Sequence, residues 1–98
     1  MAAFPADVIK LISLREGAWS EHAAEDRDRL GLVWRDVEEV ARTAFNCKRK
    51  RDVRIRGGLT YSGVGRSVGG SSLYMAGKKL SVEGEDCWYV ITIHESGR

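Results

Sequence analysis

The sequence predicts an α+β fold, with N-terminal helices packed on one face of a small antiparallel β-sheet. Helix-type spacing of apolar residues is confined to the first 45 residues, and alternating or β-branched runs are confined to the remainder. The 98 residues contain no internal repeat and no long linker, so we expect a single domain, 1–98, around one modest core.

The first two helices are indicated by residues that begin and end helices. Pro5 suits a first helical turn, where its missing N–H costs nothing, and Gly17 is a plausible stop. Ser20 is expected to cap a second helix over 21–30, which Gly31 ends. A third helix is expected over 33–44, although its start lacks a good capping residue. One stripe of that helix, at spacing i, i+3, i+4, i+7, is apolar: Val37, Val40, Ala41 and Ala44.

Residues 73–94 predict a β-hairpin, because two runs rich in β-forming residues flank a four-residue polar turn, 83–86, that contains Gly84. The second run, 87–94, is apolar on both faces and is typical of a central strand covered on both sides. We expect the helical stripe to pack on three of its residues: Tyr89, Ile91 and Ile93.

Charge is distributed unevenly along the chain. Residues 1–45 hold six Lys/Arg and nine Asp/Glu, whereas residues 46–98 hold ten and five, which together account for the net charge of +2. The densest basic cluster covers 48–56, and 52–56 alternate as a half-buried strand with a cationic outer face formed by Arg54 and Arg56. A solvated surface run is one interpretation and phosphate contact is the other. With tyrosines nearby, the pattern favours single-stranded RNA, whose bases stack on aromatic rings. Further candidates for phosphate contact are Lys48, Lys50, Arg66, Lys78 and Lys79.

Residues 57–72 contain six glycines and are expected to form a mobile binding loop. Tyr61 and Arg66 are its only large side chains with polar tips, so both are candidates for RNA contact.

Imidazole is the side chain best suited to proton transfer near neutral pH. His94 ends a strand that would hold it rigidly, which favours a catalytic role over a purely structural one. His22, with Asp26 one turn later, is either a local surface pair or a second catalytic candidate. Neither these histidines nor Cys47 and Cys87 have the spacing of a metal site, and the glycines match no nucleotide-binding motif. We therefore expect no metal and no cofactor.

No apolar run approaches the ~20 residues that span a bilayer, and the first 15 residues lack the pattern of a secretory signal. The two isolated cysteines are typical of reduced thiols. These features predict a cytoplasmic protein without a membrane partner.

Several stretches resemble the MqsR-like toxins and their small relatives in the RelE superfamily. In the helical half they are Asp-Val-Ile-Lys-Leu-Ile from 7, Trp-Ser-Glu-His-Ala-Ala-Glu-Asp-Arg-Asp-Arg-Leu-Gly-Leu from 19 and Trp-Arg-Asp-Val-Glu-Glu-Val from 34. In the hairpin they are Leu-Tyr-Met-Ala-Gly-Lys-Lys-Leu from 73 and Trp-Tyr-Val-Ile-Thr-Ile-His-Glu from 88.

The resemblance implies an mRNA interferase that cleaves free or ribosome-bound mRNA without a metal and is neutralised by a cognate antitoxin protein. It places the active site at Tyr74 and His94, where histidine stands in the position of a family lysine, with Lys48 or Lys50 matching a further lysine. Two alternatives remain open: a non-catalytic nucleic-acid-binding module that uses the basic face, and an interaction domain that pairs through a sheet edge.

Overall fold

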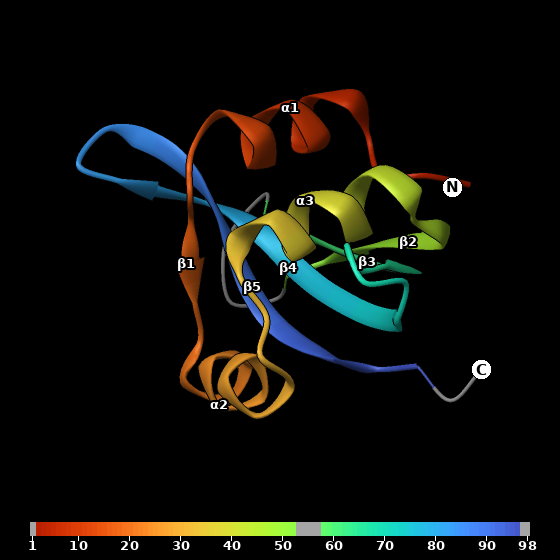
Figure 1. Cartoon of the computed structure of the whole chain (residues 1–98). Coiled ribbons are helices and arrows are strands. Elements are labelled where there is room, and N and C mark those ends of the chain that lie inside the picture. The colour runs from red at the N-terminus through yellow and green to blue at the C-terminus, as the bar shows by residue number, and fades with distance from the viewer. Residues whose placement is uncertain (1, 53–57, 97–98) are drawn as a thin grey trace.

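The structure, a computed structural model, describes residues 2–52 and 58–96. It is α+β, with three helices and a five-stranded sheet (Figure 1). The elements along the chain are α1 (Ala6–Leu14), β1 (Ala18–Trp19), α2 (Glu21–Leu30), α3 (Trp34–Thr43), β2 (Phe45–Arg51), β3 (Leu59–Arg66), β4 (Ser72–Val82) and β5 (Glu85–Glu95). None of the helices in these described ranges has the length and apolarity needed to cross a bilayer.

The sheet is mixed, which corrects the prediction of a purely antiparallel one. Its strand order is β1-β5-β4-β3-β2. β1, between α1 and α2, runs parallel to β5, and every other neighbouring pair is antiparallel. The central strand is consequently β4, and β5 lies next to the short edge strand β1.

The helix boundaries follow local capping chemistry. The Ser20 hydroxyl accepts the N–H of Ala23 at 3.0 Å, and Gly31 ends α2 in the left-handed conformation, as predicted. The missing cap of α3 is supplied from inside the helix, because the Asp36 carboxylate accepts the N–H of Val33 at 2.9 Å. α1 ends at Leu14, before the expected stop.

The β4–β5 hairpin is confirmed. Its turn has two residues, Glu83-Gly84, instead of the predicted four, because Glu85 and Asp86 already pair with β4. Both turn residues have positive φ, 52° and 81°. Two consecutive positive φ angles are typical of the type I′ turn, whose twist matches that of paired strands.

The glycine-rich stretch is mainly a strand, so the prediction of a binding loop over 57–72 is wrong for β3. Gly63 and Gly65 lie on the face of β3 that meets α3. A Cβ on Gly65 would lie 2.2 Å from the carbonyl oxygen of Val40. These glycines therefore let the helix approach the sheet closely, a requirement that overrides their weak preference for strands.

The core lies between the sheet and helices α1 and α3, and it contains the buried stripe of α3 (Figure 1). On β5 the buried side chains are Trp88, Val90 and Ile93. The spacing changes from two to three because Ala76 pairs with Thr92 and Gly77 with Val90, which leaves Ile91 as the extra residue of a β-bulge. Tyr89 and Ile91 lie on the other face, so the predicted packing is wrong for these two residues and holds for Ile93, which shares the buried cluster.

The bulge gives a direct test with a matched pair of substitutions. Ile93→Ala should lower the free energy of unfolding by about 2–5 kcal/mol, as expected for a fully buried side chain. Ile91→Ala should cost clearly less, because Ile91 is half-buried. Urea unfolding of both variants measures the difference, and equal losses would contradict the assignment of Ile91 to the bulge.

Candidate functional site

We call the sheet face opposite α1 and α3 the open face. Its side chains form three rows. The strand register defines the rows. The first contains Phe45, Val64, Tyr74 and His94; the second Lys48, Ser62, Ala76 and Thr92; the third Lys50, Thr60, Lys78 and Tyr89. None of the residues in these three rows is in the buried class, and Phe45, Lys48, Lys50 and His94 are exposed.

Tyr74 and His94 are direct cross-strand neighbours in the first row. Their rings stack with centroids 5.0 Å apart and an interplanar angle of 29°. The structure thus brings together the two residues that the sequence predicts as the catalytic pair. Both belong to the hairpin, so the sheet holds their positions.

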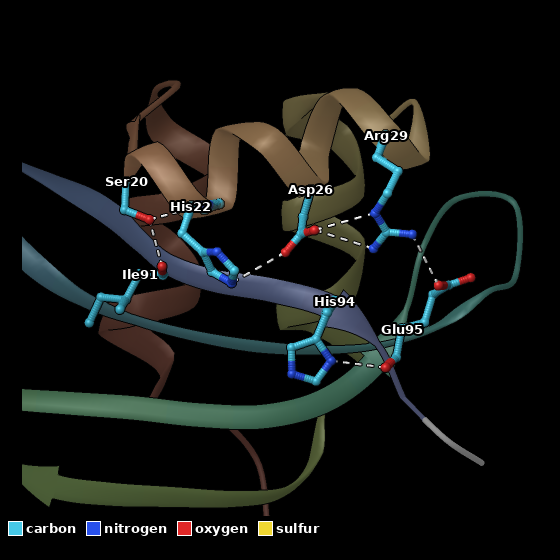
Figure 2. Close-up of polar contacts among 8 residues, drawn as sticks. Ser20, His22, Asp26, Arg29, Ile91, His94 and Glu95 are labelled. Atoms are coloured by element: carbon cyan, nitrogen blue, oxygen red, sulfur yellow. Dashed lines mark hydrogen bonds and ion pairs between the residues drawn. The ribbon is translucent and has the colours of Figure 1, made fainter.

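The His94 ring is oriented by a hydrogen bond to the backbone of the next residue. Its Nδ1 lies 2.9 Å from the carbonyl oxygen of Glu95 (Figure 2). A carbonyl can only accept, so Nδ1 carries the hydrogen of this bond. In the neutral ring, Nε2 then keeps its lone pair, and the exposed side chain offers it to a substrate as a proton acceptor.

Three of the predicted phosphate-binding cations project from the open face or its end. Lys48 and Lys50 alternate along β2 and are exposed. Arg66 ends β3 on the same face. It pairs with Ser72, in the row next to that of Tyr74. Arg66 is one row beyond Tyr74 on the neighbouring strand, whereas Lys48 and Lys50 are two strands away from Tyr74 and one and two rows from it.

The other predicted cations are placed differently. Lys78 lies on the open face but is mostly buried, with its ammonium 3.1 Å from the Asp52 carboxylate. Lys79 lies on the opposite face, where its hydrogen bond to Asp7 at 2.7 Å raises the pKa of the lysine and lowers that of the aspartate. Lys79 is therefore not part of this site. Arg54 and Arg56 lie outside the described residues, as does the predicted strand that contained them.

Tyr61 is a core residue, which corrects its assignment to RNA contact. It is only 6% exposed, and its ring centroid lies 6.3 Å from that of buried Trp88. Alternation along β3 explains this position, since Tyr61 points to the same face as Gly63 and Gly65.

Helix α2 lies alongside β5 near the site (Figure 2). The Ser20 hydroxyl donates to the carbonyl oxygen of Ile91 at 2.6 Å, and Arg29 contacts the Glu95 carboxylate at 3.5 Å. Between these anchors, Asp26 contacts both Arg29, at 3.3 Å, and Nε2 of His22, at 3.5 Å. A continuous chain of polar side chains therefore connects His22 to the end of β5.

Phe45 is a site residue that the sequence did not indicate. Asn46 has a positive φ of 55°, and the β2–β3 register shifts between Phe45 and Lys48. The shift puts Phe45 in register with Val64, in the row of Tyr74, where the phenyl ring is 57% exposed. A phenylalanine close to a basic run was the only signal in the sequence.

Both cysteines are free thiols, and burial raises the pKa of Cys47. Within residues 2–52 and 58–96, no group of three or more His, Cys, Asp or Glu side chains forms a site for a metal ion. No protein-family model, curated protein or solved structure matches this chain, so its function has to be argued from its own residues and geometry.

Proposed function

We propose that this protein is a metal-independent endoribonuclease of the RelE/MqsR-like kind, an mRNA interferase toxin whose cognate antitoxin neutralises it. The observation that carries the proposal is the stacked Tyr74–His94 pair on the open face, which also carries exposed cations. The residues that resemble this toxin family include the same pair, which supports a catalytic use of it. The proposed substrate is mRNA, free or bound to a ribosome.

The proposed chemistry starts from the RNA itself. His94 Nε2 takes the proton of a 2′-hydroxyl, whose oxygen attacks the adjacent phosphorus while the bond from phosphorus to the 5′-oxygen breaks. The products are a 2′,3′-cyclic phosphate and a 5′-hydroxyl. Lys48, Lys50 and Arg66 supply positive charge along the phosphate backbone. The Tyr74 ring, stacked on His94, keeps the imidazole in one orientation.

The test is cleavage of a long messenger RNA by the purified protein in EDTA, with ribosomes added in a parallel set. We expect products ending in a 2′,3′-cyclic phosphate, detected by their resistance to ligation at the 3′ end until the cyclic phosphate is removed. Absence of cleavage in both sets would reject the nuclease proposal.

A second candidate function, a non-catalytic RNA-binding module, is favoured by the first row of the open face. Phe45 and Tyr74 present aromatic rings at two points of one row, and flat rings on a sheet are suited to stacking on unpaired bases. This candidate predicts RNA binding without cleavage, so the cleavage assay combined with a binding measurement separates the two.

RNA affinity should depend on the cations of β2. The double substitution Lys48→Ala/Lys50→Ala should weaken binding of single-stranded RNA and reduce the slope of log affinity against log salt by roughly 0.7 per lost phosphate contact. A charge-matched control is Arg35→Ala/Arg42→Ala on α3, which lies against the opposite face of the sheet. Fluorescence anisotropy at several salt concentrations measures both. Equal slopes for the β2 variant and the wild type would show that Lys48 and Lys50 do not contact RNA phosphates.

A further inference from the structure

We propose that His22 is the second proton-transfer residue of this site, acting as the general acid that protonates the leaving 5′-oxygen. This inference rests on the proposed nuclease function and adds a residue from α2 to a site otherwise built from the sheet. The sequence contains only two histidines, and the structure places both beside the last part of β5 (Figure 2).

The relative position of the two histidines follows from how α2 is attached. Ser20 is bonded to Ile91 at one end of the contact and Arg29 to Glu95 at the other, so helix and strand run in the same direction. From Ser20 to Arg29 a helix rises about 13 Å, and from Ile91 to Glu95 a strand extends about 13 Å. The two lengths are similar, so the contacts join α2 to the last part of β5 at both ends of the helix.

Asp26 lies about 9 Å along the helix from Ser20, and His94 about 10 Å along the strand from Ile91. His22 lies about 6 Å earlier along the same axis. The imidazoles are therefore offset along β5 on neighbouring elements, and Figure 2 shows His94 below Asp26 with His22 to its left. In the proposed reaction, a phosphodiester group lies between the base at one ring and the acid at the other.

The polar contacts give the two rings different partners. His94 donates through Nδ1 to the Glu95 carbonyl, which leaves Nε2 as a proton acceptor. His22 has its Nε2 directed at the Asp26 carboxylate, with which it forms an ion pair when protonated, so its Nδ1–H is the group available to a substrate. Asp26 is itself held by Arg29 and its side chain is 16% exposed, so the carboxylate is fixed in place.

In the proposed cleavage step, the protein supplies both the group that accepts a proton and the group that donates one. His94 Nε2 accepts the 2′-hydroxyl proton as the 2′-oxygen–phosphorus bond forms. The bond from phosphorus to the 5′-oxygen breaks, and the 5′-oxygen takes the Nδ1 proton of His22. The enzyme ends with His94 protonated and His22 neutral, and exchange with water restores both.

The role of His22 as the acid can be tested separately with a substrate whose leaving group does not need a proton. The bond that the wild type cleaves is first mapped on messenger RNA, and an oligoribonucleotide is then made with sulfur in place of the 5′-bridging oxygen at that bond. A thiolate leaves without being protonated because a thiol is far more acidic than an alcohol. We expect His22→Gln to cleave the ordinary oligonucleotide on the order of 10²-fold more slowly than the wild type and to cleave the sulfur substrate at nearly the wild-type rate.

The matched comparison is His94→Gln, which should lose activity on both substrates because the 2′-hydroxyl still needs a base. Equal loss on both substrates for His22→Gln, with an unchanged unfolding midpoint, would overturn the role as acid. Wild-type rates on the ordinary substrate would also overturn it, and would leave His22–Asp26 as a surface ion pair. If the wild type cleaves neither substrate, with or without ribosomes, the nuclease proposal fails and this inference fails with it.

Discussion

Replacing His94 with glutamine should lower the rate of RNA cleavage by roughly 10²–10⁴-fold, the range for removing one general acid or base. Glutamine has a similar size and keeps a hydrogen-bond donor that can reach the Glu95 carbonyl, but it cannot accept a proton near neutral pH. His94 is exposed at the end of β5, so the fold and RNA affinity should be retained.

The measurement is cleavage of messenger RNA in EDTA by wild type and His94→Gln, with anisotropy to confirm that both bind RNA equally. Asp86→Asn is a suitable control because it changes an exposed residue at the other end of β5. In cells expressing the protein without an antitoxin, His94→Gln should also relieve growth arrest. Equal cleavage rates for the two proteins would exclude His94 as the base.

The largest expected loss of stability is at Trp88. Trp88→Ala should lower the free energy of unfolding by about 3–5 kcal/mol, the usual cost of truncating a buried aromatic side chain. Trp88 is 0% exposed, and its ring centroid lies 6.1 Å from that of Phe4. A Cβ on Gly77 would lie 2.5 Å from the indole. Since domains of this size are typically stable by only about 5–15 kcal/mol, this loss is a large share of the total stability.

Urea unfolding followed by circular dichroism gives the free energies for this comparison. Trp88→Phe should cost less than Trp88→Ala because it retains part of the buried ring, and Val82→Ala, at a 50% exposed position, should change stability by no more than about 0.5 kcal/mol. If Trp88→Ala unfolds at the same urea concentration as Val82→Ala, the indole does not organise the core as described.

Short-range features of this fold were predictable from the sequence. The Ser20 cap, the left-handed Gly31 and the Glu83-Gly84 turn depend on bonds between residues a few positions apart, so residue types and spacing are sufficient. The buried stripe of α3 was predictable for the same reason, because helical periodicity alone defines it. The pairing of Tyr74 with His94 does not belong to this class, because the register set by the turn would pair Tyr74 with Ile93 if the strand had no bulge.

Only the tertiary structure decided which face each strand residue occupies. Strict alternation would put His94 on the face of buried Trp88, but the bulge at Ile91 reverses the alternation and moves His94 to the open face beside Tyr74. Similarly, α3 packs closely on Gly65 of β3, alternation along β3 puts Tyr61 in the core, and the attachment of α2 to β5 places His22 beside that strand. A bulge or a helix contact is set by partners far away in the chain, and because strand side chains repeat every two residues, one inserted residue moves all those beyond it to the other face.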